Sequence, residues 1–347
     1  ATLLTMALAG NVQAAEIRSV GPDGEAAVDA STIELTDDQI AQIKEGGYTA
    51  AICLHYGGND WSTSQQKGLE DTFGELGIEI VAVTDANFSA ETQVSNIETV
   101  MAKKPDILVS IPTDATATAD AYKQAAAAGI KIVFMDQRAN GLEAGKDYVS
   151  VVSADNYGNG YASGTVLGDA LGGKGKVAMV YYDANFAPTN QRDEGFRDAM
   201  KNYPDIEIVT EQGFTDESGC AEQGDAILTQ FPNIDGIYAS WDVPMEGVLS
   251  AVRAAGMEGK VTLACNDLGN NVAREIASGN IAGGGAQMPY DQGVAEAKLA
   301  ALALLGEETP SYVAVPAETV THENVLEAYT DVYHVETPDW LKEAYVE

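Results

Sequence analysis

The sequence predicts an α/β protein of two similar lobes, each a doubly wound parallel sheet. One observation is that short apolar segments alternate with amphipathic segments of roughly ten to fifteen residues, the pattern of βαβ units. A second is that this alternation runs from about residue 48 to 171 and restarts at residue 177, so two similar runs follow one another. The 347 residues, 45% of them hydrophobic, suffice to fill two cores.

The first run follows a polar, acidic stretch, residues 16–46, in which only a short helix near 37–44 is expected. Ser62 is expected to cap the helix after the first strand, and Gly77 to end it. We expect the strands of this run at 49–54, 78–83, 107–111, 130–135 and 148–152, and its helices at 62–76, 90–103, 115–128 and 158–171.

The second run repeats the alternation and leads into a tail with a helix around 340–345. Its apolar segments are again short and β-leaning, as expected for strands covered on both faces. We expect its strands at 177–181, 206–209, 236–239, 261–265 and 281–287, and its helices at 192–202, 221–230, 246–255, 272–278 and 291–305.

The charge of the chain excludes two classes of partner. It carries 53 acidic and 19 basic residues, a formal net charge of -34. Nucleic acid and anionic membrane surfaces are bound by basic patches, so we expect no nucleic-acid partner and no such membrane contact. The acids are scattered rather than blocked, which is typical of a solvated surface.

No catalytic, metal-binding or cofactor-binding motif stands out. The chain lacks a nucleophile elbow, a P-loop and an HExxH motif, and its three histidines are dispersed. The glycine-rich stretches 172–175 and 283–285 are typical of turns and close approaches. We therefore expect a non-enzyme with no cofactor. The three cysteines, Cys53, Cys220 and Cys265, leave open whether two of them form a disulfide.

The N-terminal residues resemble the end of a secretory signal peptide. A short apolar run, residues 3–10, precedes small residues that suit cleavage after Ala14. No later segment reaches the roughly 20 apolar residues of a membrane span, so we expect no membrane insertion. The hypothesis is an exported, periplasmic protein; the alternative is that these residues are a cloning remnant.

Polar side chains follow many of the predicted strands, at the point where each strand ends. In the clearest case the apolar run 132–135 is followed by Asp136, Gln137 and Arg138. The carboxyl ends of parallel strands face the crevice in which open α/β sheets bind ligands. Other candidates near strand ends are Asn59, Asp60, Trp61, Arg192, Trp241, Asp242, Asn266, Asp267 and Gln287.

These residue types suit a neutral ligand with many hydroxyl groups. Carboxylates and amides accept hydrogen bonds from hydroxyls and arginine donates to them, and charge-assisted bonds are roughly twice as strong as neutral ones. The rings of Trp61 and Trp241 can cover the apolar C–H faces of a sugar. Acids outnumber bases among the candidates, which disfavours an anionic ligand.

Each candidate also has a structural alternative. Asp60, Asp242 and Asp267 precede predicted helices and could be N-caps. Trp241 could belong to the core, and Arg192 could form a salt bridge between the lobes. Asn59 and Gln287 could satisfy loop backbone, and Arg138 could point away from the crevice.

At these residues the chain resembles the periplasmic sugar-binding proteins of ABC importers, specifically the ribose-binding-protein-like group. The resemblance spans about 48–321. It rests on an apolar-apolar-Asp strand end, a Ser-Asp-Asn crossover, an Arg-x-x-Gly-Phe helix start and an Ala-Gln strand end, which are here 134–136, 153–156, 192–196 and 286–287.

This resemblance implies two lobes joined by a three-segment hinge, with a sugar clamped between them. It implies that Asp136, Arg192, Asp267 and Gln287 hold sugar hydroxyls, with Gln137 a specificity contact. The expected domains are a signal-peptide remnant, an acidic N-terminal extension, an N-terminal lobe and a C-terminal lobe with the tail, at 1–14, 15–47, 48–153 plus 288–316, and 154–287 plus 317–347.

Four departures from the group's pattern leave the particular sugar open. Trp241 replaces an amide, Asn266 stands where an aromatic residue is common, and Gln137 intervenes before Arg138. The segment 59–61 replaces an asparagine and stacked phenylalanines. A linear polyol is therefore an alternative to a pyranose.

The resemblance predicts a monomeric receptor that delivers a monosaccharide or sugar alcohol to the permease of an ABC importer. One alternative is a sugar-sensing receptor for chemotaxis or a sensor kinase. Another is a regulator related to the lactose repressor. That regulator would need a basic helix-turn-helix at its N-terminus, where this chain has a signal-like run and an acidic stretch.

Overall fold

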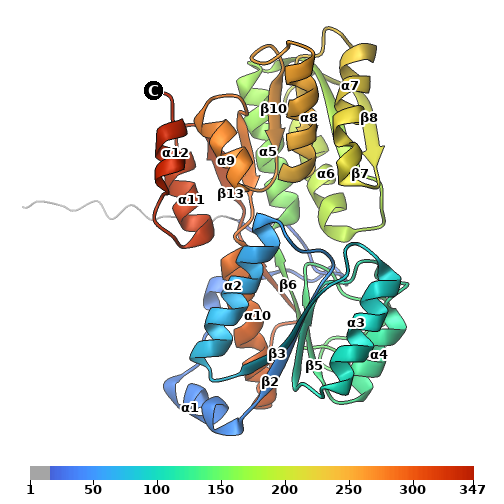
Figure 1. Cartoon of the computed structure of the whole chain (residues 1–347), viewed down its shortest axis with the longest axis vertical. Helices are drawn as coiled ribbons and strands as arrows, with labels where there is room; N and C mark the ends of the chain where they lie inside the picture. The colour runs from blue at the N-terminus through green and yellow to red at the C-terminus, as the bar shows by residue number, and fades with distance from the viewer. Residues whose placement is uncertain (1–15) are drawn as a thin grey trace, which may run out of the picture.

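The computed structural model describes residues 16–347; residues 1–15, with the predicted cleavage site after Ala14, lie outside the described part of the chain. The described residues form two α/β lobes, one above the other (Figure 1). Each lobe contains one sheet with helices on both faces, as the sequence predicts.

The N-terminal lobe contains a seven-stranded sheet in the order β1-β12-β6-β5-β4-β2-β3, in which all neighbours are parallel. The helices α2 (Asp60–Glu75) and α10 (Pro289–Leu304) cover one face, and α3 (Ala90–Ala102) and α4 (Ala119–Ala127) cover the other. The strands are β1 (Val28–Asp29), β2 (Thr49–Leu54), β3 (Glu79–Asp85), β4 (Ile107–Ser110), β5 (Lys131–Met135), β6 (Ser150–Ala154) and β12 (Tyr312–Val315).

The C-terminal lobe contains a six-stranded sheet in the order β13-β11-β10-β9-β7-β8. Its edge strand β13 (Glu318–Thr321) runs antiparallel to β11, so this sheet is not wholly parallel as predicted. The other strands are β7 (Lys174–Tyr182), β8 (Asp205–Phe214), β9 (Gly236–Ala239), β10 (Thr262–Cys265) and β11 (Gly283–Ala286).

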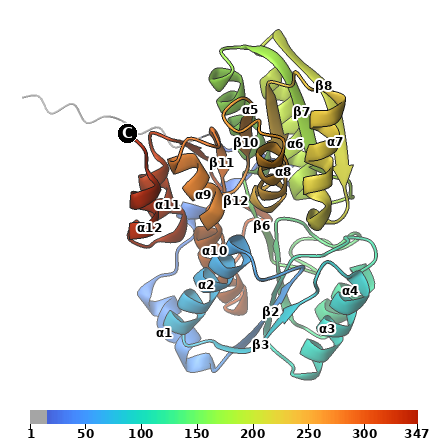
Figure 2. The same ribbon diagram turned by 45° about the horizontal axis from the view of Figure 1, so that its top comes forward.

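Two groups of helices cover this second sheet. The pair α5 (Asn156–Ala170) and α6 (Ala187–Met200) packs on one face. The opposite face carries the larger core, and Figure 2 shows α11 and α12 beside α9. The helices of this group are α7 (Cys220–Gln230), α8 (Asp242–Ala254), α9 (Asn270–Ala277), α11 (Val325–Tyr333) and α12 (Asp339–Ala344).

Within the described residues the chain passes between the lobes at three places. They connect β6 to α5, β11 to α10, and β12 to β13. As a result α10, which follows a strand of the C-terminal lobe, packs beside α2 in the N-terminal lobe (Figure 1). All three connections are short, so the lobes are held close together at the hinge.

The acidic N-terminal stretch packs on the hinge and on the edge of the first sheet. Its strand β1 pairs in parallel with β12, and Ser19 donates from both its backbone N and its hydroxyl to the Asp155 carboxylate, at 2.8 Å each. Arg138 points away from the cleft and forms a bidentate pair with Asp23, with both N–O distances 2.7 Å. The helix α1 (Asp37–Gly46) follows, near the predicted position.

Several helices begin earlier than the sequence predicts. Asn59, rather than Ser62, caps α2, and its side chain accepts from the Ser62 backbone N. The helices α6 and α8 start at Ala187 and Asp242, because Pro188 and Pro244 in their first turns are compatible with a helix start. The elements β1, β12, β13 and α11 are not among those predicted from the sequence.

Two further expectations concern cysteines and membranes. The three cysteines are free and buried, so the structure contains no disulfide between them. Among residues 16–347, no helix combines the length and the apolar character needed to cross a bilayer.

Candidate ligand-binding site

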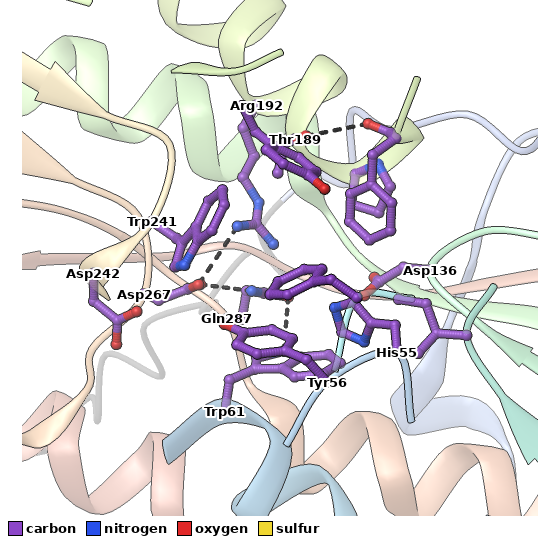
Figure 3. Close-up of a pocket in the computed structure, with 15 residues that line it drawn as sticks. His55, Tyr56, Trp61, Asp136, Thr189, Arg192, Trp241, Asp242, Asp267 and Gln287 are labelled. Atoms are coloured by element: carbon purple, nitrogen blue, oxygen red, sulfur yellow. Dashed lines mark hydrogen bonds and ion pairs between the residues drawn. The ribbon is translucent and has the colours of Figure 1, made fainter. Parts of the chain in front are cut away.

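A cavity of about 470 Å³, including the open space at its mouth, lies between the lobes (Figure 3). Several residues that line it directly follow strands, as expected for the crevice of an open α/β sheet. They include His55 after β2, Ile111 after β4, Asp136 after β5 and Gln287 after β11.

One part of the lining is a chain of hydrogen-bonded polar side chains. Trp61 Nε1 donates to Gln287 Oε1 at 3.1 Å, and Gln287 Nε2 donates to Asp267 Oδ1 at 2.6 Å. Arg192 Nη1 lies 3.4 Å from Asp267 Oδ2. We call these four residues the polar chain. Gln287, Asp267 and Arg192 all belong to the C-terminal lobe and orient one another through these contacts, so little ordering of these three side chains would be needed on binding.

Asp136 lies at the carboxyl end of β5 with a left-handed backbone (φ 54°). Its Oδ1 accepts from Ser153 Oγ at 3.0 Å, Ala154 N at 3.2 Å and Asn156 Nδ2 at 3.3 Å. These three partners belong to the Ser-Ala-Asp-Asn segment at the first crossover. The crossover therefore fixes Asp136 through one carboxylate oxygen, and Oδ2 accepts no hydrogen bond from the described residues.

Arg192 is buried in the second turn of α6, not at a helix start as predicted. Its Nε donates to Asn156 Oδ1 at 2.9 Å, and its Nη1 donates to Ser240 O at 3.3 Å. The close approach of α5 to this turn requires Gly160, because a Cβ at that position would lie 1.8 Å from Arg192 O. Glycine in α5 therefore helps to place the guanidinium in the cavity.

The cavity contains three carboxyl groups and one guanidinium. Burial raises the pKa of Asp136 and of Asp267, and the nearby positive charge of Arg192 opposes the shift in both. Burial, reinforced by the negative charge of Asp267, holds the pKa of Asp242 well above its usual value. A protonated Asp242 can donate a hydrogen bond, and it leaves the site with less negative charge than the residue count implies.

The rest of the lining is largely aromatic. Tyr56 and Phe88 stack with ring centroids 4.1 Å apart, and His55 stacks on Phe186 at 5.5 Å with an interplanar angle of 17°. The ring centroids of Phe88 and Tyr182 are 6.2 Å apart. We call these five residues the aromatic wall. His55, Tyr56 and Phe88 come from the N-terminal lobe, and Tyr182 and Phe186 from the C-terminal lobe, so both lobes build the wall.

His55 is neutral in this wall. Burial lowers the pKa of its imidazole to about 3, and the positive charge of Arg192 contributes. Its Nδ1 is buried and has no hydrogen-bond partner among the described residues. A neutral imidazole can donate through one nitrogen and accept through the other, so His55 can pair with a ligand hydroxyl.

The structure brings seven of the eleven predicted site residues to the cavity. Trp241 and Asp242 follow β9 and begin α8, and neither side chain caps that helix through its N2 or N3 backbone N–H. Trp241 is also part of the core of the C-terminal lobe, which was its alternative assignment. The seven residues are Trp61, Asp136, Arg192, Trp241, Asp242, Asp267 and Gln287.

Asn59 and Asp60 do not line the cavity, contrary to the prediction. Asn59 is the N-cap of α2, a role predicted for Ser62 from the sequence. The Asp60 carboxylate accepts from Asn270 N at 2.7 Å and from Asn270 Nδ2 at 3.0 Å. Since Asp60 begins α2 and Asn270 begins α9, this contact joins the two lobes beside the cavity.

Gln137 and Asn266 also lie outside the cavity, because protein groups occupy their polar atoms. Gln137 Nε2 donates to Pro112 O at 2.8 Å, and its Oε1 accepts from Ala187 N, in the other lobe, at 3.0 Å. Asn266 is fully buried and donates to the hydroxyl of Tyr238 at 2.8 Å. Gln137 therefore joins the lobes, and Asn266 supports the sheet behind the site.

Sequence reasoning missed the aromatic wall. His55 and Tyr56 immediately follow the predicted strand 49–54, so the strand-end criterion could have identified them. Phe88 and Phe186 lie in loops, where no periodicity marks a side chain as facing a cavity. Phe186 packs with the apolar core of the opposite lobe, a contact that depends on how the lobes meet.

Two α/β lobes that enclose a cavity at the carboxyl ends of their strands define a two-lobed ligand-binding protein. The chain belongs to the periplasmic binding protein domain family, whose model matches residues 50–308. This is a family of binding proteins, which agrees with the prediction that the chain is not an enzyme. Within the described residues no cluster of three or more histidine, cysteine or acidic side chains could hold a metal ion.

Curated relatives support the predicted resemblance to the ribose-binding-protein-like group. The chain is 27% identical over 213 residues to the ribose import binding protein of Bacillus subtilis, covering 61% of this chain and 67% of the relative. It is 29% identical over 273 residues to the D-ribose/D-allose-binding protein of Pseudomonas aeruginosa, covering 76% of this chain and 83% of the relative.

Solved structures show the same fold. An ABC transporter periplasmic solute binding protein of Actinobacillus succinogenes with bound D-allose matches with a TM-score of 0.74 and 29% identity, covering 80% of this chain and 99% of that one. A solute binding protein of Agrobacterium vitis bound with α-D-tagatopyranose matches with a TM-score of 0.76 and 26% identity. The match covers 84% of this chain and 100% of that one.

Proposed function

We propose that this protein captures a monosaccharide or sugar alcohol in the interlobe cavity and delivers it to the membrane permease of an ABC importer. The observation that carries the proposal is the polar chain of Trp61, Gln287, Asp267 and Arg192, which lies in a cavity bounded by both lobes. Because two lobes contribute to the cavity, a ligand bound there is enclosed when they close.

The donors and acceptors of the cavity match hydroxyl groups. Asp136 and Asp267 accept, Arg192 donates, and the buried Asp242 can donate when it holds its proton. Hydrogen bonds to charged groups contribute about 1.5–3 kcal/mol each, more than neutral ones. An anionic ligand would meet several carboxyl groups and one guanidinium, which favours a neutral ligand.

The relatives support both the sugar ligand and the importer partner. The names of the ribose and allose relatives describe sugar binding, and two of the matched structures are ABC transporter solute binding proteins with a bound sugar. We propose the same kind of ligand and an importer partner for this chain. An importer-linked protein works outside the cytoplasmic membrane, so we further propose export by a signal peptide that is cleaved after Ala14.

A thermal-shift screen tests the ligand class. Pentoses, hexoses, deoxy sugars and C4–C6 polyols are added at millimolar concentration, because a ligand that binds only the folded state raises the melting temperature. We expect one class to raise it and Asp136→Ala to abolish that shift. The control is Asp120→Ala, at an exposed position on α4, which should keep the ligand-induced rise in melting temperature. If no neutral polyhydroxy compound stabilises the protein, the proposal is wrong.

A further inference from the structure

Two kinds of side chain line the cavity. The polar chain, together with Asp136 and Asp242, supplies its charged groups, and the aromatic wall supplies rings that lie beside them. Trp61 and Trp241 already offer flat rings beside the polar groups (Figure 3). The wall therefore adds apolar surface beyond what is needed to cover one face of a sugar ring.

Phe88 is held at the mouth of the cavity by an unusual backbone. Phe88 and the preceding Asn87 both have positive φ, 60° and 46°. Such a conformation is uncommon for a bulky residue and persists only where the surrounding structure holds it. Hydrogen bonds from Phe88 N to His55 O and from Ser89 N to Ala86 O, both 2.8 Å, maintain it. The Phe88 ring then stacks on Tyr56 while it stays 36% exposed.

Phe186 is brought to the cavity from the opposite lobe. It immediately precedes α6, stacks on His55, and packs within the apolar core cluster of the N-terminal lobe. Tyr182 lies at the end of β7. Its ring centroid is 6.0 Å from that of Phe186 and 6.2 Å from that of Phe88. The aromatic wall is therefore complete only when the lobes are together.

Four residues that line the cavity have no polar side-chain atom, namely Phe88, Ile111, Phe186 and Pro188. A ligand hydroxyl that faces them loses its hydrogen bonds to water and gains none, which weakens binding. A methyl group in the same place is removed from water, which strengthens binding. The two contributions act in the same direction and favour a ligand that is apolar on this side.

We propose that the natural ligand is a deoxy sugar or deoxy sugar alcohol, with its hydroxyls on the polar chain and Asp136 and its methyl group against the rings of Phe88 and Phe186. This inference rests on the proposed function and narrows its ligand class. It predicts that replacing one hydroxyl of a bound hexose by hydrogen increases affinity. An ordinary sugar site, which pairs every hydroxyl, loses affinity on the same change.

Matched ligand pairs test the inference. Isothermal titration calorimetry compares each 6-deoxyhexose with its parent hexose: L-fucose with L-galactose, L-rhamnose with L-mannose, D-fucose with D-galactose, and fucitol with galactitol. We expect the deoxy member of at least one pair to bind tenfold or more tightly than its parent. If sugars bind but every parent equals or exceeds its deoxy partner, this inference is wrong and the proposed function stands. If no sugar or polyol binds, both are wrong.

Replacing Phe88 tests whether its ring is responsible for the preference for a deoxy sugar over its parent. Phe88→Asn removes the ring, and asparagine tolerates the left-handed backbone. We expect the affinity ratio of deoxy sugar to parent to fall to within threefold of one. Val83→Asn is the matched control, because Val83 is an exposed apolar residue of the same lobe on β3, outside the cavity. An unchanged ratio in Phe88→Asn, with its melting temperature retained, would contradict the assignment of the wall.

Discussion

Trp61 Nε1 donates a hydrogen bond to Gln287 Oε1 across 3.1 Å, and this bond joins the two lobes inside the cavity. Trp61 lies in the first turn of α2 in the N-terminal lobe, and Gln287 follows the strand β11 of the C-terminal lobe. Gln287 in turn orients Asp267, which pairs with Arg192. Lobe closure and the arrangement of ligand-facing groups therefore depend on the same side chains.

Replacing the indole of Trp61 tests this relationship. Trp61→Phe keeps an aromatic ring and removes the donor, so Gln287 Oε1 loses its partner. A hydrogen bond of this kind contributes about 0.5–1.5 kcal/mol, so we expect sugar affinity to fall about threefold to tenfold in calorimetry. Trp340→Phe on α12, remote from the cleft, is the control and should bind as the unmodified protein does. Unchanged affinity in Trp61→Phe would show that the bond does not matter for binding.

A substitution of Asp60 tests whether its contact with Asn270 stabilises the closed lobes. Neither residue lines the cavity. The Asp60 carboxylate accepts two hydrogen bonds at the N-terminus of α9, where the helix dipole favours a negative charge. Asp60→Ala should loosen the closed state, and we expect bound sugar to dissociate about tenfold faster in stopped-flow measurements. The control is Asp37→Ala, which removes an exposed acid from the first turn of α1 in the same lobe. Equal dissociation rates in both variants would exclude this role.

Asp193 gives the stability of the fold a defined pH dependence. Burial raises the pKa of its carboxyl from 3.8 to about 6, against the opposing effects of bonds from Ser240 and Tyr238 and the charges of Arg197 and Arg192. The folded state holds this proton more tightly than the unfolded chain does. The stability contributed by protonated Asp193 is therefore fully present below pH 3.8 and is lost as the pH rises through about 6.

Asp193→Asn removes that titration. At about 1.4 kcal/mol per pKa unit, we expect the unmodified protein to lose about 3 kcal/mol of unfolding free energy, relative to the variant, between pH 4 and pH 7. Urea denaturation at several pH values measures the difference. A difference that does not change with pH would mean that Asp193 titrates as an ordinary exposed acid.

Asp155 ties the N-terminal stretch to the hinge. Its buried carboxylate accepts from the backbone N of Arg18, Ser19 and Gly158, at 2.9, 2.8 and 3.0 Å, and caps α5. Asp155→Ala should cost about 2–4 kcal/mol of unfolding free energy, because a helix cap and buried bonds are lost together. It should also speed amide hydrogen exchange at Ser19.

Asp29→Ala is the control for that experiment. It removes an exposed cap from the short 3-10 helix η1 (Ala30–Thr32) and should leave exchange at Ser19 unchanged. Slow exchange at Ser19 in Asp155→Ala would mean that other contacts, such as the ion pair of Arg138 with Asp23, are sufficient to hold the segment.

The sequence predicted most of the architecture because apolar strands and amphipathic helices leave clear local patterns. It could not predict β1, β12 and β13, which are only two to four residues long and pair with strands far away in the chain. The predicted starts of α6 and α8 are wrong, because the first turn of each helix contains a proline and lies before the apolar pattern that marks the helix.

The strand-end criterion identified Asp136, Asp267 and Gln287 because their positions follow from sheet topology alone. It could not separate them from neighbours such as Gln137 and Asn266, whose directions depend on backbone geometry. Asp136 and Asp267 have φ values of 54° and 71°, which sequence alone does not reveal. In the aromatic wall, His55 and Tyr56 follow a predicted strand and could have been identified, whereas Phe88 and Phe186 lie in loops, and the rings of the two lobes meet only where the lobes come together.

The substitution Asp267→Asn tests whether the interlobe cavity is the sugar site. The substitution keeps the shape of the side chain, removes the charge that faces Arg192 and leaves a buried guanidinium without its counterion. In calorimetry with the best ligand from the screen, we predict one-to-one binding by the unmodified protein and at least about 100-fold weaker binding by the variant, a loss of about 2.7 kcal/mol. Asp225→Asn on α7, an exposed position, should bind normally. Affinity within threefold of the unmodified protein in Asp267→Asn would contradict the account.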